Sequence, residues 1–162
     1  MTGDAETLLS LLTRLGIEAV THHHAPAFTV EQGNAVWGAI PGLHCKNLFL
    51  KDAKARLWLV VAPVDRRIDL KRLPERIGAA RLSFGSAELL GQVLGVEPGS
   101  VTPFALINDA QRRVTPVLDA AMMAAPLVNY HPLRNDMTTT ISPDGLRRLL
   151  VHTGHSPEII TL

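Results

Sequence analysis

The chain is poor in several residue types that mark specialised classes of protein. It has one cysteine, one tyrosine and two tryptophans in 162 residues, and aromatic residues make up only 4% of it. A single thiol excludes an intrachain disulfide framework and is typical of a reducing compartment. No apolar run approaches the roughly 18 residues that a membrane span needs, and residues 1–4 do not resemble a signal peptide. We therefore expect a cytoplasmic protein without membrane contact.

The chain also lacks an excess of charge of either sign. Its 16 Lys and Arg residues face 15 Asp and Glu residues, which leaves a formal net charge of +1. No global basic footprint therefore indicates a nucleic acid, although a few local cations can still bind the phosphates of RNA. Hydrophobic residues make up 46% of the chain, enough for the core of one domain, which we expect to span residues 1–162.

Apolar periodicity and capping residues indicate an irregular mixture of helices and strands. Residues Cys45–Leu50 should pair with Leu57–Pro63 as an antiparallel hairpin. Because no βαβ rhythm appears, we predict an α+β fold. Its mixed, mainly antiparallel sheet or partly closed barrel should have six or seven strands surrounded by helices. Residues 158–162 form either an edge strand or a tail. Helices are predicted over residues 5–15, 29–37, 69–77, 87–94 and 143–153, and strands over 17–23, 45–50, 57–63, 81–84, 114–118, 127–130 and 138–141.

Lys46 and Asn47 stand at the start of the first strand of that hairpin. Successive side chains of a strand point to opposite faces, so one of the two should face inward. A lysine that faces a cleft is costly to bury unless it meets an anion or a polarised carbonyl group. The alternative is a solvated lysine at a strand end, with Asn47 closing a turn.

A second candidate is the loop Gly99–Pro103. Gly99 can take a positive φ and Pro103 fixes the exit of the loop, so several N–H groups can converge on one oxygen, as in an oxyanion hole. An ordinary connection between a helix and a strand is the alternative.

The histidines supply one more candidate. His131 ends an apolar strand, where it can donate to a substrate, act as a general base or simply occupy a loop. The run His22–His24 does not predict a metal site, because at most two adjacent strand residues can share an ion and no acidic cluster completes the set. Cys45 is interpreted as a buried apolar cysteine, since no Cys-His-Asn arrangement accompanies it. We expect neither a metal nor a cofactor.

Five short stretches in a fixed order carry a family resemblance: His24–Glu31, Cys45–Phe49, Leu57–Val61, Gly95–Phe104 and Asn129–Pro132. Together they resemble the YbaK/ProX-type aminoacyl-tRNA editing domain family, and within it the freestanding ProX proteins. The resemblance covers about residues 4–155. It implies the fold of that family and hydrolysis of the ester of alanine mischarged onto tRNA(Pro). Such editing has a physical reason, because a missing methylene is worth only about 1–3 kcal/mol in a pocket sized for proline.

The resemblance also implies roles for individual residues. Lys46 matches the lysine of the family and would hold the phosphate of the terminal adenosine or the ester carbonyl, with Asn47 hydrogen-bonding beside it. His131 matches the pocket histidine and would position the aminoacyl group. No nucleophile is evident, in agreement with a family in which a ribose hydroxyl of the tRNA helps to activate water. That requirement would separate RNA from DNA.

Further residues are expected to bind the substrate rather than to act on it. The partner implied is the acceptor end of tRNA, with prolyl-tRNA synthetase as a second partner and neither DNA nor a membrane. Backbone donors are expected from Gly99, Ser100, Val101 and Thr102, walls of the side-chain pocket from Phe28 and Val30, and a phosphate contact from Arg81.

Two alternatives stay open at this point. The same fold can act on cysteine, serine or threonine esters, because one methylene or hydroxyl decides between these side chains. A protein that binds tRNA or a nucleotide without turnover is the other alternative, although the near-neutral charge argues mildly against it. Release of an amino acid from mischarged tRNA separates an enzyme from a binding module.

Overall fold

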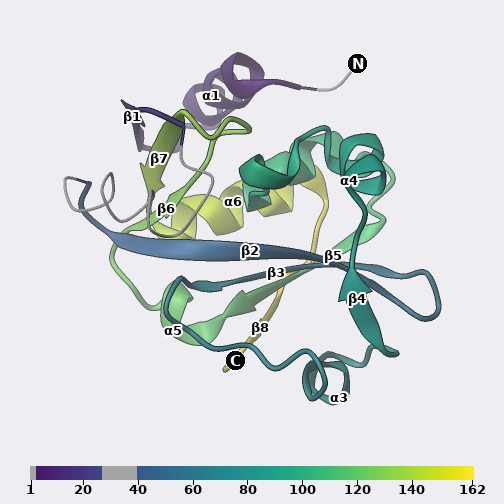
Figure 1. Cartoon of the computed structure of the whole chain (residues 1–162). Helices are drawn as coiled ribbons and strands as arrows, with labels where there is room; N and C mark the ends of the chain where they lie inside the picture. The colour runs from purple at the N-terminus through teal and green to yellow at the C-terminus, as the bar shows by residue number, and fades with distance from the viewer. Residues whose placement is uncertain (1–2, 27–39) are drawn as a thin grey trace.

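The computed structural model describes residues 3–26 and 40–162, and its helices and strands follow one another without a regular rhythm (Figure 1). The helix predicted over residues 29–37 lies outside the described residues. Among those described, no helix combines the length and the hydropathy that crossing a bilayer requires. The helices are α1 (Ala5–Arg14), α3 (Leu73–Ile77), α4 (Ala87–Leu94), α5 (Ala120–Met123) and α6 (Pro143–Thr153), with 3-10 turns η1 (Pro98–Ser100) and η2 (Pro103–Asn108). The strands are β1 (Ala19–His23), β2 (Leu43–Asp52), β3 (Leu57–Pro63), β4 (Leu82–Phe84), β5 (Val114–Asp119), β6 (Val128–Tyr130), β7 (Met137–Ile141) and β8 (Glu158–Ile160).

The eight strands form one mixed sheet in the order β1-β7-β6-β2-β3-β5-β8, and β4 also pairs with β2. The pairs β1–β7, β6–β7, β2–β3 and β2–β4 are antiparallel, whereas β2–β6, β3–β5 and β5–β8 are parallel. The α+β class and the mainly antiparallel sheet are therefore confirmed. Among the described residues the sheet ends at β1 and β8 without closing into a barrel, and it has eight strands where about six or seven were predicted. The eighth is β8, which becomes a strand because it pairs with β5.

Side-chain caps set the starts of α1, α4 and α6, whereas α3 begins at Leu73 rather than at Asp69 as predicted and has no side-chain cap. The side chains of Asp4, Ser86 and Ser142 each accept a main-chain N–H of the first turn that follows. Gly95 and Gly154 end α4 and α6 in the left-handed conformation, which glycine adopts without a steric cost. Helices α4 and α6 lie on the same side of β2 and β3 (Figure 1).

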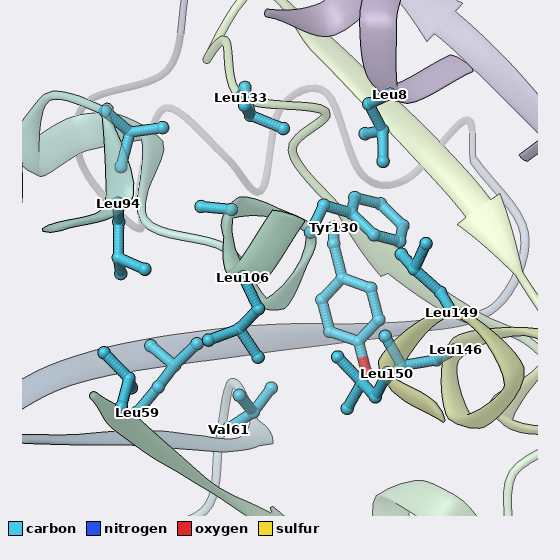
Figure 2. Packing of buried hydrophobic residues seen from close by; sticks show 14 of the residues in the cluster. Leu8, Leu59, Val61, Leu94, Leu106, Tyr130, Leu133, Leu146, Leu149 and Leu150 are labelled. Carbon is cyan, nitrogen blue, oxygen red and sulfur yellow. The ribbon is translucent and has the colours of Figure 1, made fainter. Parts of the chain in front are cut away.

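Apolar side chains cover both faces of the central hairpin. One face packs against α1, α4, η2 and α6 in a larger cluster that includes Phe104. Tyr130 lies in the same cluster (Figure 2). The other face packs against the α3 region, and Leu48 and Leu50 of β2 point to it. Because Phe49 belongs to the first cluster, the two faces alternate along β2 as a strand requires.

Candidate active site

A small cavity lies where the start of β2 meets β6 and β7. Its volume is about 20 Å³. Asn47 and His131, two of the three residues predicted to be catalytic, both line it, although they come from distant parts of the sequence. The other lining residues are His44, Cys45, Asn129, Tyr130 and Thr138.

Tyr130 fixes β6 beside this cavity. Its ring packs among the leucines of α6 and η2 (Figure 2) and lies edge-on to Phe104, with ring centroids 5.5 Å apart. Its hydroxyl donates to the sulfur of Met122 at 3.2 Å. Burial raises the pKa of Tyr130 well above its usual value, so the phenol stays neutral. The strand is thus held from within the core, and its neighbours Asn129 and His131 are held with it.

Asn129 joins the entry of β2 to the strands opposite. Its amide nitrogen donates to the main-chain oxygen of Pro41 at 2.9 Å and, more weakly, to that of Leu43 at 3.4 Å. Its amide oxygen accepts from the hydroxyl of Thr140 at 2.5 Å. Gly42, between the two acceptors, has a φ of 100°, and a Cβ there would come within 2.9 Å of the Asn129 nitrogen. Asn129 therefore sets the distance between β2 and β7 across the cavity.

His131 presents one nitrogen to the cavity in a fixed tautomer. Its Nδ1 lies 2.9 Å from the main-chain oxygen of Met137. Since a carbonyl oxygen only accepts, Nδ1 carries the proton and Nε2 of the neutral ring has a free lone pair. Burial disfavours the imidazolium and lowers the pKa of His131 below its usual 6.5, an effect that outweighs the Met137 contact. The ring is therefore neutral at pH 7.

Thr138 lines the cavity and is in hydrogen-bond contact with His24, which lies behind it. Nδ1 of His24 lies 2.7 Å from the carbonyl oxygen of Ala25, and Nε2 lies 2.8 Å from the hydroxyl oxygen of Thr138. The same tautomer argument makes Nε2 an acceptor in the neutral ring, so Thr138 donates to it. The His24 and His131 rings are 6.4 Å apart. Sequence reasoning missed Thr138, because a threonine in a β-branched run carries no signal beyond that of a strand.

Asn47 contributes an acceptor that nothing in the described chain satisfies. Its Oδ1 is buried and has no hydrogen-bond partner. A buried polar atom of this kind is unusual and calls for an explanation such as a ligand. Its position in β2 is fixed by its pairing with Val61 of β3, which orients the side chain toward the larger apolar cluster and the cavity.

Between its pairings with β6 and with β4, one edge of β2 is not paired with another described strand. On one edge β2 pairs with β6 at Leu43 and His44 and with β4 at residues 50–52. Leu43 N–H donates to Leu127 on this edge and the Phe49 oxygen accepts from Gly85, so by alternation the Asn47 N–H points to the same edge. Within the described residues no strand covers this stretch. The Asn47 N–H is therefore a donor available at the rim of the cavity.

Comparison with known proteins gives this geometry its context. The family model described as "Aminoacyl-tRNA editing domain" matches residues 24–149. The chain is 34% identical over 158 residues to "Prolyl-tRNA editing protein ProX" of Acetoanaerobium sticklandii, covering 97% of this chain and 96% of that protein. The chain belongs to the aminoacyl-tRNA editing domain family.

Two further relatives agree with this membership. The editing domain is 39% identical over 156 residues to "Prolyl-tRNA synthetase associated domain-containing protein 1" of Danio rerio, with 95% of this chain and 85% of that protein covered. A solved structure described as "a putative trans-editing enzyme for prolyl tRNA synthetase" superposes with a TM-score of 0.73 at 19% identity, over 100% of this chain and 99% of that one. At that identity the superposition shows the fold alone.

Lys46 of the editing domain does not line the cavity. It pairs with Ala62 and shares its face of β2 with Leu48 and Leu50, opposite to the face of Asn47. The alternation expected from the sequence thus brings Asn47, rather than Lys46, to the cavity. Lys46 is half-buried, and in the described part of the chain it has no hydrogen-bond or ion-pair partner.

The Gly99–Pro103 loop also lies outside the cavity. Gly99 belongs to the turn η1 and does not take a positive φ, unlike Gly95 at the end of α4. Ser100 is buried and its N–H donates to Glu97, while the buried Thr102 caps η2 with its hydroxyl and Val101 packs on the core. The structure therefore gives this loop local contacts in place of the freely turning glycine expected from the sequence.

The same loop does approach His131 indirectly. Ser100 and residues 95–97 line a second hollow of about 330 Å³ together with Leu133–Asp136, the turn that follows His131. Leu133 has a φ of 69° in that turn, a conformation that costs a leucine energy and that clusters at functional sites. Ser100 of the loop thus shares this hollow with the turn that follows His131.

Of the remaining predicted residues, Arg81 is not brought to the cavity. Arg81 is exposed and precedes β4, whose first residue pairs with Asp52. Five residues of strand separate Asp52 from Asn47, or about 16 Å at the usual rise per residue. Phe28 and Val30 lie outside the described residues. Desolvation raises the pKa of the half-buried Cys45 thiol to about 12, which argues against a role as a nucleophile. Among the described residues, no three His, Cys, Asp or Glu side chains gather as a metal site.

Proposed function

We propose that this editing domain is a trans-editing deacylase that hydrolyses Ala-tRNA(Pro) to alanine and free tRNA. The observation that carries the proposal is the cavity of about 20 Å³ between Asn47 and His131, in a chain of this family. Such a volume accommodates one group of about the size of a water molecule or a methyl. The three methylene groups of the proline ring exceed it, so the cavity favours alanine by size. The relatives named for prolyl-tRNA support tRNA(Pro) as the carrier.

The reaction needs water and a hydrogen-bond donor that stabilises the negative charge developing on the carbonyl oxygen of the ester. The water oxygen attacks the carbonyl carbon, the bond to the ribose 3′-oxygen breaks, and that oxygen takes a proton as free tRNA leaves. The Asn47 N–H at the rim of the cavity is suited to stabilise the carbonyl oxygen as it becomes negative. His131 positions the aminoacyl group, and the neighbouring ribose hydroxyl assists the water. No side-chain nucleophile is required.

Lys46 has a different role in this proposal. Its ammonium group has no partner among the described residues and lies on the face of β2 that Asn47 does not use. A lysine there suits a phosphate of the terminal nucleotides, which lie outside the cavity, better than the ester carbonyl. Its loss should weaken binding of tRNA and should leave the choice between alanine and proline unchanged.

The test is deacylation of Ala-, Ser-, Cys- and Pro-tRNA(Pro) by the wild-type protein, Lys46→Ala and the control Lys54→Ala, an exposed lysine at the tip of the hairpin. We expect selective release of alanine, a loss of tenfold or more in kcat/KM for Lys46→Ala and a change within twofold for Lys54→Ala. Equal rates for wild type and Lys46→Ala would remove the role of Lys46. Turnover of none of the four esters would indicate a binding module instead of an enzyme.

A further inference from the structure

Residues 65–76, the basic segment that leads from β3 into α3, carry a concentration of positive charge. They hold five of the 16 Lys and Arg residues of the chain and three of its 15 Asp and Glu residues. The rest of the chain has eleven cations against twelve acids, so the net positive charge of the protein resides in this segment. A local excess of this kind on a nearly neutral protein is typical of a surface that binds a polyanion.

Apolar side chains hold the basic segment against one face of the sheet. Ile68 and Leu70 pack against the cluster that contains Leu50 of β2. Figure 1 shows the segment and α3 on the side of β2 and β3 opposite to α4 and α6. Half-buried and exposed residues alternate from Arg67 to Lys71, so the anchors point inward and the charged side chains point to solvent.

Two arginines of the basic segment are fixed by main-chain acceptors that follow β8. Arg66 donates to the Leu162 oxygen at 2.8 Å, and Arg76 donates to the Thr161 oxygen. Each guanidinium has five N–H donors, so these bonds leave further donors for a ligand. Both arginines are thus held in place before a partner binds, which reduces the entropy lost on binding.

Three further cations of the basic segment are available to a partner. Within the described residues, the side chains of Arg67 and Lys71 have no hydrogen-bond or ion-pair partner. Arg72 lies 3.7 Å from Asp69, but both side chains are more than half exposed, and such a pair is worth little in water. Arg67, Arg72 and Arg76 line one hollow of about 270 Å³, to which Asp69 contributes an acid. Guanidinium groups around a hollow suit the oxygens of a phosphate.

The basic segment begins beside Lys46. The Val64 N–H, at the end of β3, donates at 2.9 Å to the oxygen of His44, two residues before Lys46. Lys46 also shares its face of β2 with Leu48, which packs against the same apolar cluster as Ile68. Positive charge therefore starts at Lys46 and continues along one face of the molecule to α3.

From this arrangement we propose that the basic segment is a second contact surface for tRNA, which binds phosphates of the acceptor stem, one of them in the hollow between Arg67, Arg72 and Arg76. The proposal rests on the proposed function, because it names a further surface for the same substrate. The backbone of tRNA presents a row of anions, and neutralising them supplies affinity that depends on salt. The aminoacyl group carries no phosphate, so this surface contributes to the binding of tRNA and not to the choice between amino acids.

The test removes the three exposed cations of the segment that bind no main-chain group. The variant Arg67→Gln/Lys71→Gln/Arg72→Gln leaves Arg66 and Arg76 in place, and its Kd for uncharged tRNA(Pro) is measured from about 50 to 200 mM salt. We expect binding at least tenfold weaker than that of wild type at the lowest salt. The slope of log Kd against log salt should fall by about two, because each lost phosphate contact removes about 0.7–0.9 from it.

Two more variants separate local charge from net charge and from folding. Arg14→Gln/Lys54→Gln/Arg147→Gln removes three exposed cations from other elements, so it has the same net charge and should keep its Kd within twofold of wild type. Asp69→Asn removes the acid of the hollow and should bind tRNA about twofold more tightly, a gain that partial unfolding would not produce. Equal Kd values and salt slopes for the two triple variants, or a wild type that does not bind tRNA, would overturn the proposal.

Hydrolysis distinguishes this proposal from the proposed function. The ester 3′-O-alanyladenosine has no phosphate, so the first variant should hydrolyse it at the wild-type rate, while its KM for Ala-tRNA(Pro) rises at least tenfold. If wild type hydrolyses neither ester, the proposed function fails and the Kd values for uncharged tRNA decide the proposal alone. Unchanged binding of tRNA together with weaker binding of prolyl-tRNA synthetase would assign the surface to a protein partner and overturn the proposal.

Discussion

The Nδ1 atom of His131 lies 2.9 Å from the main-chain oxygen of Met137, and this contact decides which nitrogen of the ring faces the cavity. His131→Asn keeps an amide N–H near Met137 and removes the Nε2 lone pair. We expect its kcat/KM on Ala-tRNA(Pro) to fall at least tenfold while the urea midpoint changes little. A variant as active as wild type would contradict any role of Nε2 in the site.

Activity should depend on pH through the same group. Burial lowers the pKa of His131 from 6.5, so the ring stays neutral somewhat below that pH and becomes protonated only at lower pH. The kcat/KM profile should therefore fall on the acid side, with its midpoint at a pH below 6.5. Since the unfolded chain takes up the proton first, the contribution of the neutral ring to stability is present above pH 6.5 and is lost as the pH falls through the folded pKa. A profile that rises on acidification would oppose this assignment.

Asn129 should be important for stability because both ends of its buried amide are bonded. Asn129→Ala leaves the Pro41 oxygen and the Thr140 hydroxyl without their partner. We expect a loss of about 2 kcal/mol in the free energy of unfolding, measured with urea. Asn135→Ala, in the half-buried turn after His131, is the control and should change stability by less than about 0.5 kcal/mol. Equal effects of the two changes would show that the amide does not join β2 to β7.

Substitution of glycine by alanine should have opposite effects on stability at Gly85 and at Gly91. A Cβ at Gly85 would lie 2.4 Å from ring atoms of Phe49, so Gly85→Ala should destabilise the fold by about 1–3 kcal/mol. Gly91 lies inside α4 with nothing within 4 Å of its Cβ position, so Gly91→Ala should stabilise by about 0.5–1 kcal/mol. The melting temperatures of the two variants should therefore move in opposite directions, and a shift of the same sign would contradict the packing around Phe49.

The Cys45 thiol should react slowly in the folded protein. Burial raises its pKa to about 12, so very little thiolate exists at pH 8. We expect alkylation by iodoacetamide to be at least a hundredfold slower in buffer than in denaturing urea. Labelling of the native protein at the rate of an exposed thiol would show that Cys45 is an accessible nucleophile.

The elements of the fold could be predicted from the sequence wherever the signal is local. The starts of α1, α4 and α6 are indicated by the capping residues Asp4, Ser86 and Ser142. The apolar runs of β2 and β3 indicate the hairpin. The strand β8 could not be decided, because Glu158–Ile160 acquires its partner β5 only through tertiary contact. The four-residue helix α5 has no periodicity long enough to detect.

For the candidate site too, local features could be predicted from the sequence, whereas features that depend on the whole sheet could not. The residue types at Asn47 and His131 could be selected from the sequence, and the strand period correctly required Lys46 and Asn47 to face apart. Which of the two faces the cavity depends on the pairing of Asn47 with Val61, and this is a property of the whole sheet. The contact of Thr138 with His24 joins residues that are more than a hundred positions apart in the sequence. Such relationships are absent from local patterns.

The central claim is tested most directly by the ratio of kcat/KM for Ala-tRNA(Pro) to that for Pro-tRNA(Pro), measured with the wild-type chain. The small cavity between Asn47 and His131 predicts release of alanine with a ratio of at least a hundred. Comparable release of alanine and proline, or release of neither, would contradict the account.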